Sequence, residues 1–150
     1  MGTRCLTTFG QGNEEIVVLY RQFDGYPEGH GAELARFLAG STIVNGIRGD
    51  EGTIFNGMGC LAASVVAHFK EEVGGFYLYP VGTRNRGEDY LYEVYGEVSQ
   101  EPHIKCSESY GEKDVLFDGS ASQYLVWLNT QAEYPPHSLP AGVNTGRKDA

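Results

Sequence analysis

The spacing of apolar residues near the start of the chain is that of two β-strands. Residues 3–9 and 16–21 are rich in apolar, aromatic and β-branched side chains, and successive strand residues point to opposite faces of a sheet. We therefore expect Ile16, Val18 and Tyr20 to share one face. The turn residues 10–13 predict that the two strands form a hairpin. Further strands are predicted at 76–80 and 89–98, with weaker ones at 103–107 and 114–118.

The clearest helix is predicted near the middle of the chain. Six apolar residues recur there at intervals of three and four, which places them on one face of a helix. These residues are Met58, Leu61, Ala62, Val65, Val66 and Phe69. We expect Asn56 to cap the start of this helix and Gly74–Gly75 to end it.

Two further helices are predicted on weaker patterns. The first is expected to begin between Glu28 and Gly31 and to end at Ala39, on the helical spacing of Leu34, Phe37 and Leu38. Ser120 is expected to cap the other, because serine accepts hydrogen bonds from the free N–H groups of a first helical turn.

The order of these elements predicts the fold class. Helices and strands do not alternate strictly, and hairpins dominate, which favours an α+β domain over a doubly wound parallel sheet. We predict a single α+β domain over residues 1–131, with a mainly antiparallel sheet and two or three packed helices. Residues 132–150 are rich in proline and polar side chains, and we expect a tail without a core of its own.

The formal net charge of −9 narrows the range of partners. An acidic surface repels phosphate backbones, so direct binding to nucleic acid polymers is not expected. Solubility is the simplest reason for such a charge. The alternative is imitation of nucleic acid, but the acidic residues come in pairs and not in a long run, which speaks against it.

Cysteine and apolar content exclude several other classes of protein. Three cysteines without a CxxC spacing predict neither a disulfide framework nor a zinc site. The first nine residues lack the apolar core of a signal peptide, and no stretch reaches the ~18 apolar residues of a membrane span. We expect a cytoplasmic protein with no cofactor, no bound metal and no membrane contact.

The first group of candidate binding residues lies in the segment YRQFDGYPEGHG, residues 20–31. It places Asp24, Tyr26, Glu28 and His30 before a predicted helix, whose free N–H groups attract anions. These residues could form a pocket wall, with Asp24 accepting hydrogen bonds from ribose hydroxyls. The alternative is a structural turn, in which Asp24 bonds backbone amides and His30 lies at the surface.

A second group lies in the glycine-rich segment 40–57, which could hold a short strand or two. It ends at Asn56–Gly59, where backbone N–H groups at a helix start can approach a phosphate. Arg48 or these backbone groups could complete an anion site. Because no P-loop or dinucleotide-binding glycine motif is present, a tight helix entry is the simpler explanation.

The third group is Arg84 and Arg86, in a turn between tyrosine-rich strands. Guanidinium groups pair with phosphates and tyrosine rings stack on bases, so these arginines with Tyr77 or Tyr79 suit a small nucleotide. In the alternative, the tyrosines alternate into the core and the arginines offset nearby acids. The five tyrosines of these strands cannot all be buried, because each hydroxyl needs a partner.

Signatures of catalysis are weak in this sequence. Cys60 and His68 lie eight residues apart on one predicted helix, about 12 Å along its axis, which is too far for a catalytic pair. The four histidines show no HxH or HExxH spacing. A small hydrolase that uses Asp24, Glu28 and His30 stays open as an alternative.

Four stretches of the chain resemble one family of small, mostly uncharacterised proteins of phages, prophages and some bacteria. They are MGTR, YRQFDGYPEGHG, FNGMGCLAA and YLYPVGTR, and the likeness covers residues 1–98. The resemblance implies an accessory role, such as inhibition of host defence, and supplies no reaction.

Our principal hypothesis is a phage-type anti-defence protein that sequesters a small nucleotide-like signal in the host cytoplasm without catalysis. Arg84 and Arg86 would bind phosphates while Tyr26, Tyr77 or Tyr79 stacks on the base. The hypothesis requires the glycine-rich turns and the arginine–tyrosine hairpin to converge in one hollow. We also expect a homo-oligomer, because exposed sheet edges invite pairing. The alternative is an anti-CRISPR-like acidic inhibitor that docks on the basic groove of a host nuclease.

Overall fold

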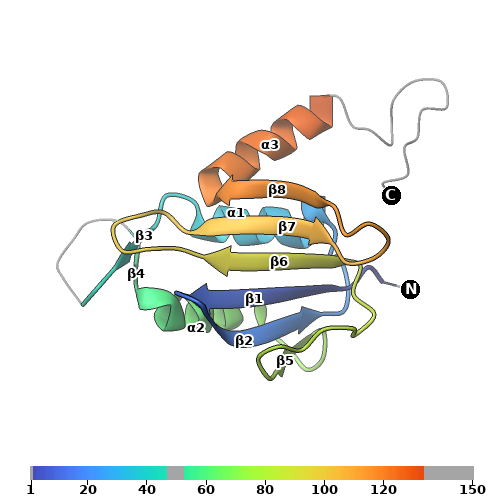
Figure 1. The fold of residues 1–150 in the computed structure, drawn as a ribbon, viewed down its shortest axis with the longest axis horizontal. Helices are drawn as coiled ribbons and strands as arrows, with labels where there is room; N and C mark the ends of the chain where they lie inside the picture. The colour runs from blue at the N-terminus through green and yellow to red at the C-terminus, as the bar shows by residue number, and fades with distance from the viewer. Residues whose placement is uncertain (1, 47–52, 134–150) are drawn as a thin grey trace.

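The computed structural model describes residues 2–46 and 53–133, which form two β-sheets and a layer of helices (Figure 1). The strands are β1 (Cys5–Gln11), β2 (Glu14–Arg21), β3 (Thr42–Val44), β4 (Ile54–Asn56), β5 (Phe76–Tyr79), β6 (Tyr90–Tyr95), β7 (His103–Glu108) and β8 (Val115–Ser120). The helices are the π-helical turn η1 (Pro27–Gly31), α1 (Ala32–Leu38), α2 (Gly57–Phe69) and α3 (Ala121–Glu133). The strands and helices predicted from the sequence are all present, within a few residues of the expected positions.

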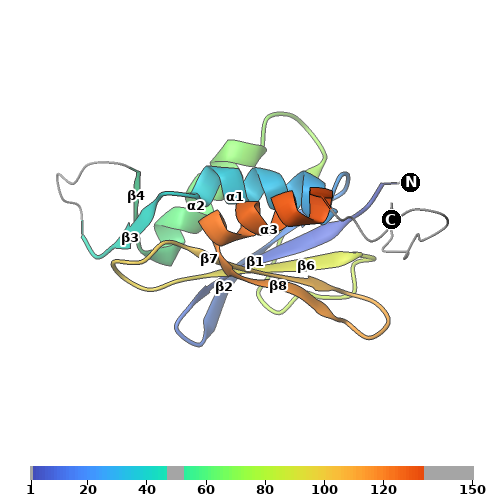
Figure 2. The same ribbon diagram turned by 90° about the horizontal axis from the view of Figure 1, so that it is seen from above.

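The larger sheet has the strand order β5-β2-β1-β6-β7-β8, and all of its neighbouring pairs are antiparallel except β1 and β6. Strands β3 and β4 form a small parallel sheet beside it. The helices cover one face of the larger sheet and leave the other face open (Figure 2). The prediction of an α+β fold with a mainly antiparallel sheet is therefore confirmed.

The helix-covered face of the sheet carries the hydrophobic core. Cys5 and Phe9 of β1 and Tyr92 and Val94 of β6 are at most 1% exposed there, because residues two apart in a strand share a face. The apolar residues that α1 and α2 contribute are Leu34, Ala35, Leu38, Met58, Leu61, Ala62, Val65 and Phe69. Each large buried side chain contributes about 1.5–3 kcal/mol to stability, so this face holds the domain together.

A helix-free connection, residues 80–89, crosses the open face of the sheet. Strands β5 and β6 run in the same direction but are separated by β2 and β1, so the chain must return along the sheet. Parallel strands are usually linked by ~12 or more residues that include a helix. Here the connection is shorter and contains no helix. Because it lies over the open face, Leu6 and Val18, which point away from the helices, are 0% exposed.

The helix ends differ in part from the predictions. Ser120 caps α3 as expected: its hydroxyl accepts a hydrogen bond from the Gln123 amide, and the Gln123 side chain accepts one from the Ser120 amide. Asn56 precedes α2 but makes no capping hydrogen bond, so that prediction is wrong. Helix α2 also ends at Phe69, well before the predicted glycine pair, because Lys70 already has an extended backbone.

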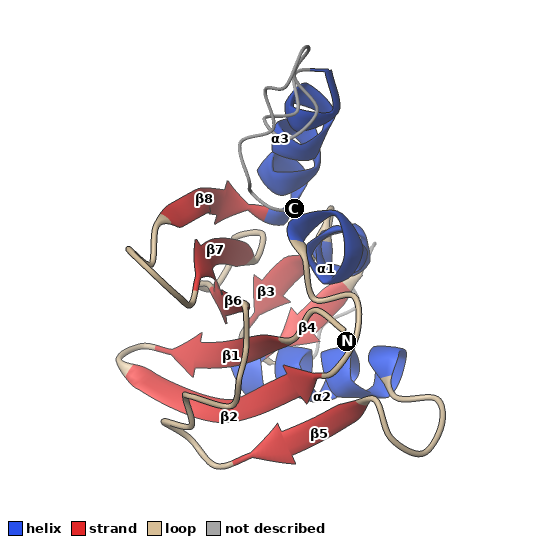
Figure 3. Cartoon of the chain, turned by 90° about the vertical axis from the view of Figure 1, so that its right-hand side faces the viewer, coloured by secondary structure: helices blue, strands red, loops and turns tan. Residues whose placement is uncertain are grey.

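Helix α3 continues past residue 131, where the predicted domain ends. Helix α3 follows the edge strand β8, projects past the sheet (Figure 3) and runs to Glu133. Residues 134–150, which make up most of the predicted tail, lie outside the described residues. None of the helices within residues 2–46 and 53–133 has the length and apolar character needed to cross a membrane.

A substitution at Gly31 would test how tightly the helices pack on the sheet. A Cβ atom at this position would overlap the Tyr124 hydroxyl and lie 3.0 Å from the Tyr92 ring. Overpacking a filled core costs ~1–3 kcal/mol, so we expect Gly31→Ala to lower the free energy of unfolding by at least that amount. Chemical denaturation measures this quantity.

The matched control is Gly59→Ala in α2, where a Cβ atom would meet nothing within 4 Å. Alanine is the better helix former, so this variant should gain about 0.5–1 kcal/mol. Wild-type stability in Gly31→Ala would contradict the packing described for this position.

Candidate functional site

The segment YRQFDGYPEGHG forms a structural turn on the helix-covered side. The Tyr92 hydroxyl donates a hydrogen bond to the Gly25 carbonyl at 2.8 Å, and the Tyr124 hydroxyl donates one to the Pro27 carbonyl at 2.9 Å. The Gly25 amide donates to the Thr3 carbonyl. Two buried tyrosines from distant parts of the chain therefore fix this turn, which agrees with the structural alternative.

His30 lies at the centre of a buried polar network. Its Nδ1 is 3.2 Å from Arg21 Nη1, which can only donate, so Nε2 carries the proton and donates to the Thr7 hydroxyl at 2.7 Å. Glu33 holds the same Arg21 nitrogen at 2.7 Å. Burial, together with the charge of Arg21, lowers the pKa of His30 to about 3. Both expectations for His30, ligand contact and a surface position, are wrong because the ring is 0% exposed.

This network leaves His30 without the role that the hydrolase alternative gave it. Both ring nitrogens of His30 are bonded and the ring stays neutral, so it is not a base for substrate. Asp24 and Tyr26 are exposed, and the Tyr26 hydroxyl lies 3.5 Å from Asp24 Oδ1. Asp24 also has a left-handed backbone, φ 63°, and its carbonyl accepts the His30 amide. Asp24 therefore shapes the turn through its backbone.

The predicted anion site at the start of α2 is occupied by contacts within the protein. The Asn56 side-chain oxygen accepts a hydrogen bond from the Gly46 amide at 2.7 Å. The Met58 amide, which could have met a phosphate, donates to the Gln11 side chain at 3.3 Å. Arg48, the cation proposed for this site, lies outside the described residues. The segment thus agrees with the simpler explanation of a tight helix entry.

Arg84 is held by Glu15 on the open face. Its two terminal nitrogens lie 2.9 and 3.4 Å from the two Glu15 oxygens, and the Gly82 amide donates to the same carboxylate at 2.6 Å. Partial burial raises the pKa of Glu15, but the hydrogen bonds from Arg84 and Gly82 outweigh it and leave the pKa below its usual value. Arg84 therefore fastens the 80–89 connection to β2.

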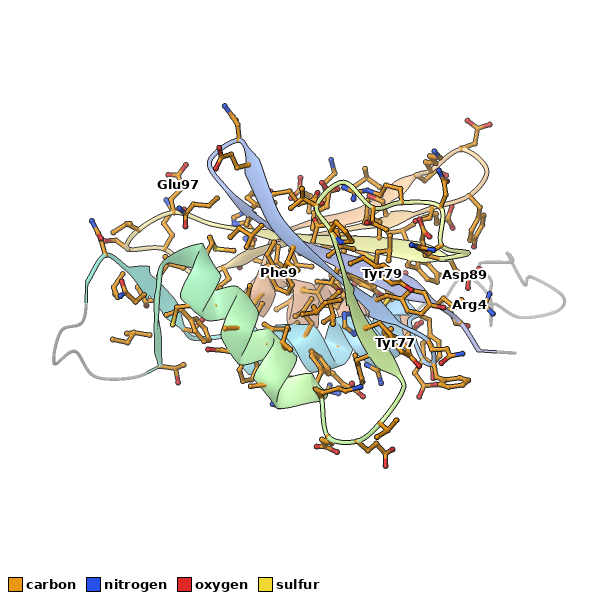
Figure 4. All side chains as sticks on the ribbon, turned by 90° about the horizontal axis from the view of Figure 1, so that it is seen from below. Arg4, Phe9, Tyr77, Tyr79, Asp89 and Glu97 are labelled. Atoms are coloured by element: carbon orange, nitrogen blue, oxygen red, sulfur yellow. The ribbon has the colours of Figure 1, made fainter. Side chains whose placement is uncertain are left out.

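A cluster of tyrosines and arginines lies beside this attachment; we define the tyrosine–arginine cluster as Arg4, Tyr20, Tyr77, Tyr79 and Arg86. The Arg86 guanidinium lies 4.2 Å from the centroid of the Tyr79 ring. The Tyr20 ring lies 6.0 Å from that of Tyr79 and 6.1 Å from that of Tyr77. Figure 4 shows Arg4, Tyr77 and Tyr79 gathered toward one end of the sheet.

Loop contacts place Arg4 and Arg86 close to this aromatic surface. The Arg4 amide and carbonyl both bond Asp89, at the end of the 80–89 connection. Gly87 lets the connection pass close to Arg4, because a Cβ atom there would lie 3.2 Å from the guanidinium. Within the described residues, the Arg86 guanidinium has no carboxylate at ion-pair distance.

The predicted site residues therefore do not converge in one hollow, and that expectation is wrong. The residues on the open face or its loop are Arg84, Arg86, Tyr77 and Tyr79. Those in the turn packed on the helix-covered side are Asp24, Tyr26 and His30. Asn56 is the last residue of β4, which pairs with β3, and Figure 1 shows these two strands at one end of the larger sheet.

Among the hollows formed by residues 2–46 and 53–133 are two that contain no predicted site residue. One, of about 350 Å³, is an apolar groove where Ala62, Ala63 and Val66 of α2 face Leu78 of β5. The other, of about 230 Å³, lies on the open face; we call it the acidic hollow. Its side-chain lining includes Thr8, Glu14, Glu15, Glu93 and Tyr95.

No known protein family, curated protein or solved structure matches this chain at a significant level. The resemblance to phage-type proteins thus remains a prediction. The case for function consequently rests on the geometry of the open face.

The pH dependence of stability tests the His30 network. Folding lowers the pKa of His30 from 6.5 to about 3, so only the unfolded chain binds a proton between these values. The stability from this group is complete above pH 6.5 and is lost as pH falls toward 3. Between pH 7.5 and 5, the wild type should lose about 2 kcal/mol that a His30→Gln variant does not lose.

Denaturant unfolding at the two pH values measures this difference in the free energy of unfolding. The contributions of the other histidines cancel in the comparison, because both proteins contain them. NMR of the His30 ring in the wild type gives an independent reading and should show a neutral imidazole at pH 5. A ring that titrates with a midpoint near 6.5 would refute the buried arrangement.

Proposed function

We propose that the protein binds a small nucleotide-like anion at the tyrosine–arginine cluster, without catalysis. The observation that carries the proposal is the Arg86 guanidinium, exposed and stacked 4.2 Å from the Tyr79 ring centroid. Arginine in this position offers a planar cation for phosphate, and the neighbouring tyrosines offer rings for a base. One surface thus offers a contact for the phosphate and a contact for the base of a nucleotide.

The charge around the cluster favours an anion despite the acidity of the whole chain. Arg4, Lys70 and Arg86 are three of the 11 basic residues in the sequence. The Lys70 ammonium lies 5.6 Å from the Tyr77 ring centroid, on the edge strand β5. The net charge of −9 repels a long phosphate backbone, whereas this local concentration of cations suits a single small ligand.

The exposure of the rings also fits binding by stacking. Tyr77 is 45% exposed and Tyr79 is half-buried, so each ring is held by the sheet and still reachable from solvent. Stacking of a base on an aromatic side chain is worth about 1–3 kcal/mol. A phosphate contact from Arg86 adds to this, which is enough for reversible binding of a small molecule.

We further propose that binding withholds a small nucleotide signal of host defence from its receptor. This part of the proposal rests on the sequence resemblance to phage-type proteins. Binding without turnover suits such a role, because a sequestering protein needs only to retain its ligand. The absence of an accessible base at His30 supports binding without turnover.

Isothermal titration calorimetry against a panel of linear and cyclic nucleotides tests the proposal. We expect at least one nucleotide to bind, and Arg86→Gln to weaken it about tenfold through loss of a charged hydrogen bond. Tyr79→Leu should weaken it by a similar factor, whereas Tyr79→Phe keeps the ring and should retain most of the affinity.

Arg36→Gln is the matched control, because Arg36 is an exposed arginine at the end of α1 and carries the same charge change. The wild-type ligand should also come out of the protein chemically unchanged, as chromatography can show. If no nucleotide binds at millimolar concentration, or if Arg36→Gln weakens binding as much as Arg86→Gln, the proposed site is wrong.

A further inference from the structure

The acidic hollow lies on the open face, at the end where the β1–β2 hairpin turns. Its volume of about 230 Å³ is below the ~300–1,000 Å³ of pockets for drug-sized ligands, so it suits a small ion or one end of a larger molecule. Gly10 helps to create the space, because this strand position carries no side chain. The hollow is distinct from the tyrosine–arginine cluster, so a ligand bound there is independent of the nucleotide proposed for the cluster.

Thr8 is a buried polar group that lines this hollow. It is 5% exposed, and its neighbours Thr7 and Phe9 belong to the helix-covered face, so alternation along β1 turns the Thr8 side chain toward the hollow. The Thr7 hydroxyl bonds His30, but the Thr8 hydroxyl makes no hydrogen bond to any side chain or backbone group of the described residues. Buried hydroxyls normally have a partner, so the hollow should supply one.

Carboxylates stand beside this hydroxyl. Glu93 is the residue paired with Thr8 across β1 and β6, and Glu14 also lines the hollow. Glu15 is already engaged by Arg84 and Gly82, which leaves Glu93 and Glu14 to act on a ligand. Lys105 is the cross-strand neighbour of Glu93 in β7, but the two form no ion pair within 4 Å.

The geometry favours an organic cation over a metal ion. Within residues 2–46 and 53–133, no group of three or more His, Cys, Asp or Glu side chains is arranged to hold a metal. Calcium and magnesium take about six or more oxygen ligands, which this lining does not gather. An alkylammonium group needs only two or three hydrogen-bond acceptors, and a carboxylate beside a hydroxyl provides them.

We propose that the acidic hollow binds an alkylammonium group, with the Glu93 carboxylate and the Thr8 hydroxyl accepting hydrogen bonds from its N–H groups. Glu14 adds negative charge at the entrance. The alkyl chain of the ligand leads out past Tyr95, whose hydroxyl is already bonded to Asp118.

The test is an NMR titration of ¹⁵N-labelled protein with n-butylammonium, and with n-butanol as a neutral probe of the same shape. We expect n-butylammonium to shift the amide signals of residues 8–15 and 93–95, and n-butanol to leave them unchanged. Glu93→Gln should weaken n-butylammonium about tenfold, since a hydrogen bond to a charged group is lost. Glu112→Gln, an exposed acid in the β7–β8 turn, is the matched control and should bind like the wild type.

Three further variants keep the test independent of folding. Gly10→Val fills the hollow and should abolish binding while the fold is retained, because its Cβ atom meets only the Glu14 carbonyl, at 3.6 Å. Thr8→Val should weaken binding and raise the Tm of the free protein, because it removes an unpaired buried hydroxyl. Thr7→Val on the opposite face should lower the Tm, because it breaks the bond to His30.

Each outcome of the titration decides for or against the proposal. Absence of shifts up to 50 mM n-butylammonium (about 50-fold above a 1 mM Kd), equal shifts with n-butanol, or full binding by Gly10→Val would each overturn the proposal and leave water as the partner of Thr8. Titration with Nα-acetyl-lysine amide identifies the source of the ammonium group. Tighter binding of this compound than of n-butylammonium assigns the hollow to a protein lysine, and weaker binding assigns it to a small amine.

Discussion

The carboxylate of Glu15 organises the open face of this protein. It accepts hydrogen bonds from the Gly82 amide and the Arg84 guanidinium, and so ties the 80–89 connection to β2. That connection has to cross the open face because the sheet places β2 and β1 between β5 and β6. It covers Leu6 and Val18 and brings Arg86 onto Tyr79, and Glu15 itself lines the acidic hollow. Both proposed sites therefore adjoin the contact that Glu15 makes.

The two faces of the sheet have different roles. The polar groups buried on the helix-covered side bond one another: His30 with Thr7 and Arg21, and Tyr92 with the backbone of Gly25. Satisfied polar networks of this kind rigidify a core and offer nothing to a ligand. The open face instead presents Arg86, exposed tyrosines and the Thr8 hydroxyl, which has no partner among the described residues; this is why we place ligand binding there.

Sequence periodicity predicted the elements well because it reports local burial. The apolar stripe of α2 and the alternation of Tyr90 and Tyr92 with their neighbours each depend on a single segment, and these predictions are confirmed. The alternation failed at Ile16, where Phe9 pairs with Val17 and Gly10 with Glu15. Ile16 is the extra residue of a β-bulge, so it joins Val17 at the helix side and Glu15 turns to the open face.

The location of the site depended on long-range contacts that periodicity does not contain. Arg84 was correctly expected in a turn, but its partner Glu15 lies 69 positions away in the sequence. His30 resembled a ligand-binding residue because it stands among polar and glycine residues, yet contacts with Thr7 and Arg21 bury it. The position of Asn56 before α2 predicts a helix cap, but its side-chain oxygen accepts a hydrogen bond from the Gly46 amide instead. Long-range contacts of this kind decide which polar side chains are left without a partner in the protein and can bind a ligand.

Hydrogen–deuterium exchange of the protein with and without a saturating nucleotide tests the central claim, that ligands bind on the open face. Our account predicts slower exchange in peptides covering residues 76–90, which include β5 and the connection held by Glu15. Peptides covering residues 22–34, on the helix-covered side, should exchange as in the free protein. Protection confined to residues 22–34 or to 54–60 would contradict it.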